Sequence, residues 1–473
     1  MDERTLARTI TSPQYFALAF GCVVGVAWIV LIGDLIGRAG PLGAAAAVVA
    51  GGLVITLVAF CYAEMSGLRP AAGGELVYAH ELNGAGAAFG VGWALALLYV
   101  ATCVFEAISM GLVADMLFPG VRGPLLYQVF GAEVRLGGVL IGIGVTLALW
   151  AINTLGTRLT ASAQEWITYV RLVLMLGFLA VAIAFAEPAN LAPAFGPQHG
   201  PAGVAFLGVL TTTPFIFGGF NVFATATEEC AGTSTKRRVG RAVVLSILAA
   251  TLFYVLLVLS IGALVPRAEL VQMKLPAAEA FHAVPGGALV AKVVLAAALL
   301  GNLTAWNALL IAGSRVLFAL GRAGLAGAPF GGLHPTRRTP AFAIGFVSLV
   351  SLAGLFLGRG FILPIVNVTS VCFALTYMVT ALAVLRLRRT DPGAERPWSV
   401  PGGRPTARLA LAGSAIVLVI AVAQPWLAAP GKVPAEWWIL LGWSSLGALV
   451  WITTGPRRAL ITAEERRRRL SGG

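Results

Sequence analysis

The chain has 473 residues, of which 58% are hydrophobic and only 11% are charged. Soluble domains carry about 25% charged residues, so this composition excludes a soluble globular protein and predicts a polytopic membrane protein. The formal net charge is +13, but the positions of the basic residues, given below, argue against nucleic acid as a partner.

Windows of about 20 apolar residues predict twelve membrane-spanning helices and therefore an all-α fold. The expected spans are 14–38, 42–66, 88–117, 136–155, 161–186, 203–227, 239–264, 288–320, 341–357, 361–385, 407–428 and 436–455. The third and eighth spans exceed a straight crossing, so we expect them to tilt or to project into the cytoplasm.

Basic residues gather in alternate connections between these spans. With the N-terminus inside the cell, 24 of the 33 Lys and Arg residues lie on the cytoplasmic side, as the positive-inside rule requires. Both termini are therefore predicted to be cytoplasmic, and the "ERRRR" run at 465–469 is predicted to set topology and to contact anionic lipid. The excess of Arg over Lys, 29 to 4, indicates a GC-rich bacterial genome, so the cytoplasmic membrane is the expected location.

The first five spans and the next five can be superposed as two units of opposite topology, because an odd number of crossings separates their first helices. These units, an inverted repeat, cover residues 14–186 and 203–385. A cytoplasmic tail (1–13) precedes them, and two peripheral helices (407–455) and a basic tail (456–473) follow.

Glycine interrupts the first helix of each unit. Span 1 contains "FGCVVGVAWIV" (20–30), and span 6 contains "TPFIFGGFNVF" (213–223). Where the backbone leaves the helix, its free N–H and C=O groups are tolerated in a membrane only if they line a cavity or bind a ligand. Interruptions at matching places in two halves therefore favour a transporter's binding site, with tight helix packing as the alternative role of the glycines.

Six short motifs follow one another along the chain. They are "FGCVVGVAWIV…GRAGPLGA", "CYAEMSGLRPAAGGELVYAH" (61–80), "NTLGTR" (153–158), "EECAGTSTKRRVGRA" (228–242), "AGSRVLFALGRAGL…HPTRRTPAFAI" (312–344) and "LRLRRTDPGAERPWSVPGG" (385–403). In content and order they resemble the amino acid–polyamine–organocation transporters over nearly the whole chain. The resemblance implies a leucine-transporter-like core of ten helices, with helices 1 and 6 broken, and alternating-access transport of an amino acid or organic amine.

The resemblance also implies which residues bind the substrate. The backbone of the first interrupted helix corresponds to the family's carboxylate-binding segment, and that of the sixth corresponds to its amine-binding segment. Carried onto this chain, these positions are Gly25, Val26 and Ala27, and Phe217, Gly218, Gly219, Phe220 and Asn221. The family's usual G-S-G is G-V-A here, so a hydroxyl and a second glycine are missing. Trp306 is also expected to line the pocket, with core packing as the alternative.

A charged residue, Arg171, lies in the middle of the predicted fifth helix, in "ITYVRLVLML" (167–176). Proton-coupled members of the resembled family often carry Lys at this point, eighteen residues after the Asn of the N-T-L-G motif, here Asn153. The resemblance implies a built-in cation in the place where sodium-coupled members bind sodium. Its expected neighbours are Gly21, Val24, Asn302, Thr304 and Asn307. A buried ion pair that joins helices is the alternative, and arginine is a poor proton carrier because it does not lose its proton.

Glu106 lies mid-way along the third span, where a carboxylate should face a cavity or a partner. Three roles are open: it pairs with Arg171, it takes up a proton during transport, or it binds a cationic group of the substrate.

The sequence therefore predicts a sodium-independent amino acid transporter that works by proton symport or by exchange. Transport of a polyamine or other organic amine is the alternative, and a non-transporting nutrient sensor is a remote one. The histidines form no H-E-x-x-H motif and no G-x-x-x-x-G-K-[ST] loop occurs, so we expect no enzyme activity, metal or cofactor. The expected partners are a small-molecule substrate, protons and membrane lipid, and no oligomeric state is predicted.

Overall fold

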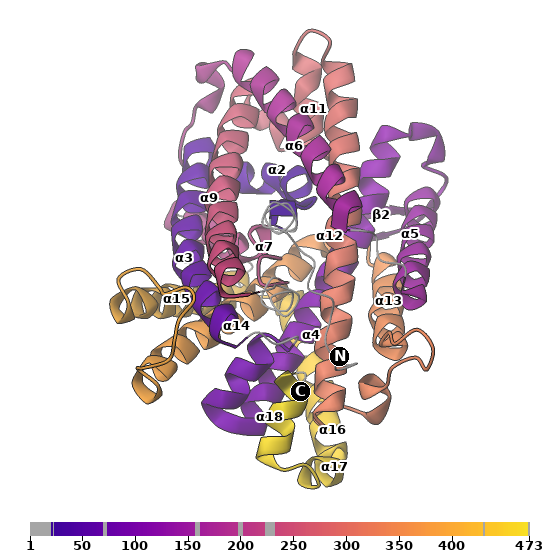
Figure 1. Ribbon diagram of the computed structural model, residues 1–473. Helices are drawn as coiled ribbons and strands as arrows, with labels where there is room; N and C mark the ends of the chain where they lie inside the picture. Colours follow the sequence, from indigo (N-terminus) through magenta and orange to yellow (C-terminus); the bar gives the residue numbers. More distant parts are fainter. Residues whose placement is uncertain are drawn as a thin grey trace.

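The computed structural model describes residues 20–21, 23–69, 73–156, 161–196, 202–222, 232–428 and 431–471. The predicted N-terminal tail, the beginning of the first predicted span and the end of the sixth lie outside these residues. Most of the described chain is α-helix (Figure 1).

The α-helices are α2 (Ala27–Ala39), α3 (Pro41–Leu68), α4 (Glu75–Leu117), α5 (Leu136–Leu155), α6 (Ala161–Ala184), α7 (Ala202–Ile216), α9 (Gly232–Leu264), α10 (Arg267–Leu270), α11 (Pro276–Glu279), α12 (Gly287–Arg322), α13 (Ala341–Leu355), α14 (Ile362–Thr390), α15 (Arg404–Ala428), α16 (Ala435–Thr453), α17 (Gly455–Ala459) and α18 (Ala463–Ser471). The 3-10 helices are η1 (Pro119–Val121), η2 (Pro188–Leu191), η4 (Ala280–Ala283), η5 (Ala328–Gly331) and η6 (Arg359–Phe361). One antiparallel hairpin, β1 (Leu125–Val129) with β2 (Ala132–Arg135), lies between α4 and α5.

Within the described residues, nine helices are long and apolar enough to cross a membrane. Each overlaps one of the predicted spans, and two shorter apolar helices, α13 and residues 203–216 of α7, overlap two more. The protein is therefore a polytopic helical membrane protein, as the composition predicts. The count of twelve spans stays a prediction.

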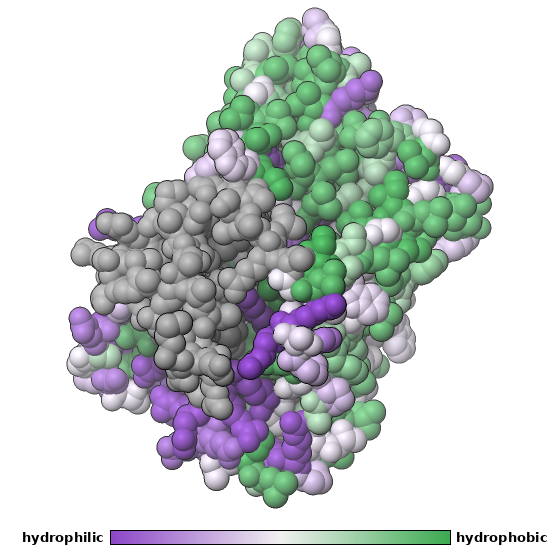
Figure 2. Space-filling view, turned by 45° about the vertical axis from the view of Figure 1, so that its right-hand side comes forward, coloured by the Kyte–Doolittle hydropathy of each residue, from purple (hydrophilic) through white to green (hydrophobic). Residues whose placement is uncertain are grey.

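The long helices α3, α9 and α12 run along the long axis of the molecule, and α6 crosses it obliquely (Figure 1). The small helices α17 and α18 lie at one end, and α11 lies at the other. Much of the visible side is hydrophobic, whereas hydrophilic side chains gather at the lower end (Figure 2). Large apolar side chains such as Leu53, Val173, Leu252 and Ile452 are exposed on the helices, as lipid-facing positions require.

Close helix packing brings α3 against α7 and α9. A Cβ atom at Gly51 would lie 2.2 Å from Oγ1 of Thr213 on α7, and one at Gly52 would lie 2.5 Å from Oγ1 of Thr251 on α9. Glycine at these two positions lets the three backbones approach, as small residues do between membrane helices.

Helix α4 changes direction near its beginning. Asn83 and Gly84 have non-helical backbone angles, and Gly84 has a φ of +71° that glycine adopts without a steric penalty. The bend separates residues 75–82 from the main helix, which matches the predicted third span closely. The first segment lies between two predicted spans, and most of it is buried.

The basic run in α18 is only partly a surface feature. Arg466 is buried and donates hydrogen bonds to the carbonyl oxygens of Ala323, Arg458 and Ile461. Burial lowers the pKa of its guanidinium below the usual value. Arg468 is exposed and pairs with Glu464 at 3.5 Å, so the predicted contact of this run with lipid stays a prediction.

Candidate substrate and cation site

The helical path stops and restarts near Gly25. Phe20, Gly21 and Val23 are helical, residues 24–26 form bends, and α2 begins at Ala27. Both Val24 and Val26 are buried. Backbone groups of this segment are therefore released from the helix inside the protein, where they need partners or a ligand.

A second interruption follows α7. The helix ends at Ile216, residues 217–221 form turns, and Gly219 has a φ of +94°. Phe217, Phe220 and Asn221 are all buried. A Cβ atom at Gly218 would lie 2.4 Å from Cζ of Phe373 on α14, so glycine is required for this close approach.

Arg171 is 1% exposed and its Nη2 donates a hydrogen bond to the carbonyl oxygen of Gly21 at 3.2 Å. The guanidinium also lies against Gly301 of α12, where a Cβ atom would be 2.6 Å from Nη1. The same Cβ atom would be 3.2 Å from the carbonyl oxygen of Gly25. Arg171 therefore occupies the junction of the first interruption with α6 and α12.

The polar residues of α12 that were predicted near Arg171 make other hydrogen bonds. Nδ2 of Asn302 donates to the backbone oxygen of Glu106, and Oγ1 of Thr304 donates to the backbone oxygen of Gly301. Oδ1 of Asn307 accepts from Nδ2 of Asn153 on α5 at 2.8 Å. The Asn302 and Asn307 bonds join α12 to α4 and α5, and the Thr304 bond lies within α12.

Glu106 lies on α4, is 4% exposed, and faces the first interruption. Its Oε1 is 3.5 Å from the point that a Cβ atom of Gly25 would occupy. Glu106 and Arg171 thus approach the same glycine from different helices, which places a carboxyl group and a cation around one stretch of free backbone.

Aromatic residues pack beside both interruptions. The rings of Phe217 and Tyr254 are 5.6 Å apart, and the rings of Phe105 and Phe215 are 4.7 Å apart. Trp306 is buried on α12, and its indole N–H has no acceptor among the described residues. That donor is available to a ligand, although packing in the core also explains the ring.

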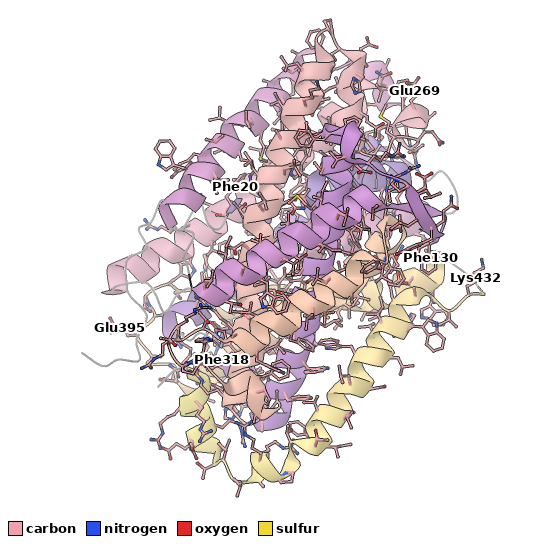
Figure 3. The ribbon with its side chains drawn as sticks, turned by 90° about the vertical axis from the view of Figure 1, so that its right-hand side faces the viewer. Phe20, Phe130, Glu269, Phe318, Glu395 and Lys432 are labelled. Atoms are coloured by element: carbon pink, nitrogen blue, oxygen red, sulfur yellow. The ribbon has the colours of Figure 1, made fainter. Side chains whose placement is uncertain are left out.

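A cavity of about 1920 Å³ opens at the α11 end of the molecule. Its lining includes Val30, Leu31 and Asp34 of α2 and Ile108 of α4, so it reaches within about one helical turn of Ala27 and Glu106. Phe130 and Lys432 also line it, and Figure 3 shows them on the opposite side of the molecule from Glu395.

A cluster of buried polar contacts around Glu75, at the beginning of α4, was not predicted in detail from the sequence. Oε1 of Glu75 accepts hydrogen bonds from Tyr62 at 2.9 Å and from Nδ2 of Asn221 at 3.2 Å. The same Nδ2 lies 3.0 Å from the hydroxyl of Tyr99. The sequence signal for this cluster was the acidic residue in "GGELVYAH", Glu75. Its burial could not be predicted, because it depends on helices that are distant in sequence.

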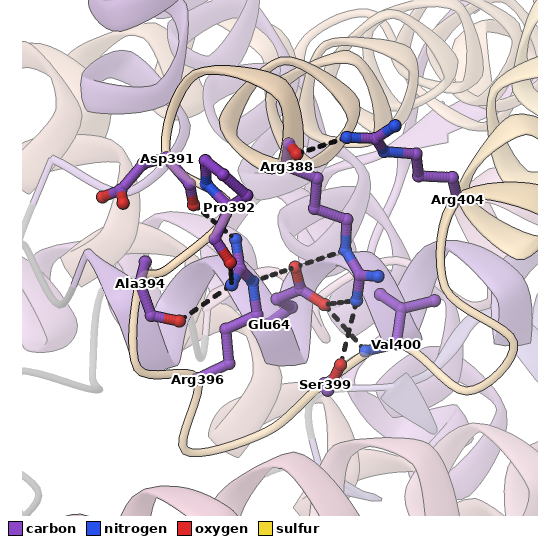
Figure 4. A network of polar contacts seen from close by, with 9 residues as sticks. All are labelled: Glu64, Arg388, Asp391, Pro392, Ala394, Arg396, Ser399, Val400 and Arg404. Atoms are coloured by element: carbon purple, nitrogen blue, oxygen red, sulfur yellow. Dashed lines mark hydrogen bonds and ion pairs between the residues drawn. The ribbon is translucent and has the colours of Figure 1, made fainter.

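A third buried carboxylate, that of Glu64, lies near the end of α3. It links α14 to residues 391–403, the segment between α14 and α15 (Figure 4). It accepts hydrogen bonds from Arg388, from Arg396 and from the backbone N–H of Val400. The N···O distances for Arg388 are 2.9 and 2.5 Å, and the geometry is bidentate.

Comparison with known sequences gives one family. A sequence model described as "Amino acid permease" matches residues 10–451. The chain is 27% identical over 465 residues to a methylthioribose transporter from Bacillus subtilis (strain 168), with 97% of this chain and 96% of that protein covered. It is 24% identical over 412 residues to branched-chain amino acid permease BcaP of the same organism, with 85% of each covered. It is also 24% identical over 466 residues to chloroplastic cationic amino acid transporter 6 of Arabidopsis thaliana, with 91% and 78% covered.

Proposed function

The chain belongs to the amino acid permease family, and we propose that it carries an amino acid across the cytoplasmic membrane by alternating access. The observation that carries this proposal is the arrangement around Gly25. Free backbone, a buried carboxyl group and a buried cation meet there, within about one turn of a large cavity that is open at one end. The proposal takes the α11 end as extracellular and the α18 end, with both termini, as cytoplasmic.

We assign the substrate's carboxylate to the backbone of Gly25, Val26 and Ala27, and its amino group to residues 217–221. Helix α2 begins at Ala27, and the N-terminus of a helix favours an anionic group. The proposed architecture is two inverted repeats, residues 14–186 and 203–385, with peripheral helices at 407–455. The interruptions at 24–26 and 217–221 occupy matching places in these repeats.

Arg171 is the proposed resident cation that makes sodium unnecessary. Its hydrogen bond to Gly21 supports this role, because it binds the backbone that a metal ion would otherwise bind. Since arginine keeps its proton, coupling to protons requires a carboxyl group, and Glu106 is the candidate that faces the substrate segment. Pairing with Arg171 and binding of a cationic substrate group are the other two roles of Glu106.

Replacing Glu106 with glutamine is expected to remove the response of uptake to an inward proton gradient. One pH unit corresponds to about a tenfold substrate ratio for one coupled proton, so accumulation should fall by about that factor. Uptake into liposomes with and without the gradient measures this. Glu464→Gln, which changes an exposed carboxyl group of α18, is the control. A variant that still responds to the gradient but loses only cationic substrates would assign Glu106 to substrate binding instead.

Two other substrate classes have specific support. The G-V-A sequence lacks the hydroxyl of the usual carboxylate clamp, and one relative that covers 97% of the chain is a methylthioribose transporter, whose substrate has neither carboxylate nor amine. An organic amine is the other class. Uptake of labelled branched-chain and cationic amino acids, with methylthioribose and polyamines as competitors, is expected to show amino acid transport that does not require sodium. Competition by methylthioribose alone would contradict the proposed substrate class.

A further inference from the structure

Glu75 is a buried carboxyl group that forms no ion pair with any cation in the described part of the chain. It is 1% exposed at the beginning of α4, and no ion pair within the described residues includes it. Two other buried carboxyl groups differ in this respect, because Glu64 has two arginines and Glu106 faces the glycine that Arg171 also approaches. An ionised carboxylate that is buried without a cation is strongly disfavoured, and the group takes up a proton instead.

The surroundings of Glu75 reinforce this conclusion. Phe220 packs within 5.1 Å of the Tyr62 ring and 5.4 Å of the Tyr377 ring, so aromatic groups exclude water from the site. The titratable groups that face Glu75 in the described part of the chain are all tyrosines, and none supplies a positive charge: Tyr62 of α3, Tyr78 and Tyr99 of α4, and Tyr377 of α14.

Glu75 and Asn221 each have one acceptor oxygen that receives no hydrogen bond from a described residue. Nδ2 of Asn221 donates to Oε1 of Glu75, which leaves Oε2 of Glu75 and Oδ1 of Asn221 buried without a donor among the described residues. A carboxylate has no donor, whereas a carboxylic acid has one O–H. A proton on Oε2 of Glu75 therefore supplies the donor that the acid–amide pair lacks, and one small side-chain rotation lets it serve Oδ1 of Asn221.

We propose that Glu75 holds a proton while the α18 end of the molecule is closed, and releases it when that end opens. Opening separates Asn221 and Tyr62 from the carboxyl group and admits water. The O–H bond then breaks, its electron pair stays on the carboxylate, and the proton passes to water. The role of Glu75 in transport rests on the proposed function, because Asn221 belongs to the substrate-binding segment and couples substrate release to proton release. The protonation of Glu75 in the folded protein does not depend on that function.

Infrared difference spectroscopy tests whether Glu75 is protonated and does not require transport activity. The full-length protein in nanodiscs is expected to show a carbonyl band of a protonated carboxyl group that Glu75→Gln removes. Glutamine has the same shape as the acid and keeps an N–H donor for Asn221, so the fold should survive. An unchanged band in Glu75→Gln would overturn the proposal, as would a band removed only by Glu106→Gln. If Glu75→Gln fails to fold, Asn221→Ala is expected to shift the band to higher frequency, and a band that does not move overturns the proposal.

Transport measurements then test the coupling. In liposomes, Glu75→Gln is expected to keep substrate counterflow, which needs no net proton movement. Accumulation driven by a gradient of one pH unit should fall by about tenfold. Unchanged accumulation would overturn the role in coupling. A wild-type protein that moves no amino acid would refute the proposed function, while the infrared band would still decide whether Glu75 is protonated.

Discussion

Replacing Arg171 with leucine is expected to reduce sodium-independent uptake by at least about tenfold and to destabilise the protein. The guanidinium is the described donor to the carbonyl oxygen of Gly21 and fills the space beside Gly301. Without it, a buried carbonyl group loses its partner, at a cost of about 1–3 kcal/mol, and the two helices lose their link through this contact. A cost of 1.4 kcal/mol corresponds to a factor of ten in an equilibrium. Uptake should therefore fall about tenfold or more, with a lower melting temperature.

The Arg171→Lys variant distinguishes the effect of the positive charge from that of the shape and hydrogen-bond donors of arginine. Lysine keeps a positive charge but lacks the planar, multiple N–H donors of arginine, so uptake should fall less than in the leucine variant. Lys292→Leu, which removes an exposed cation from α12, is the control and should behave as wild type. Uptake by Arg171→Leu that is equal to wild type in the absence of sodium would show that the resident-cation role is wrong. Restoration of uptake by added sodium would support that role directly.

The helices that face lipid were the easiest part of the fold to predict. The spans predicted at 42–66 and 136–155 agree with α3 and α5 within two residues at each end, because continuous hydrophobicity alone determines such a helix. Family membership was also predicted correctly from short motifs. The bend at Gly84 and the hairpin β1–β2 were not predicted, since one glycine or the eleven-residue stretch 125–135 has several local conformations and tertiary contacts choose among them.

The parts of the candidate site that were predicted are those marked in the sequence by a glycine or a charged residue within an apolar helix. Gly25 and Arg171 are unusual residues within apolar runs, and the structure brings both to one junction. Gly301 and Glu75 were missed as site residues. Gly301 is one of many glycines, and only the neighbouring guanidinium gives it a role. Glu75 lies between two predicted spans, and its burial is produced by α3, α14 and the segment after α7 together.

Replacing Glu64 with alanine is expected to cause one of the largest losses of stability in the molecule. Its carboxylate accepts hydrogen bonds from Arg388, Arg396 and the N–H of Val400 (Figure 4). Removal leaves two mostly buried guanidinium groups facing each other without a negative charge. Breaking a buried ion pair by removing one partner costs about 3–5 kcal/mol. Thermal unfolding in detergent should show a marked fall in the melting temperature.

Glu81→Ala is the matched control for this prediction. Glu81 also pairs with two arginines, Arg69 at 3.0 Å and Arg467 at 2.8 Å, but both of these partners are substantially exposed. Exposed ion pairs contribute about 0–1 kcal/mol, so Glu81→Ala should unfold within a few degrees of wild type. Glu64→Gln should fall between the two, because the amide retains one acceptor but loses the charge. Equal stability of Glu64→Ala and Glu81→Ala would mean that burial does not strengthen the Glu64 contacts. The joint between α3 and the segment after α14 would then be held by apolar packing.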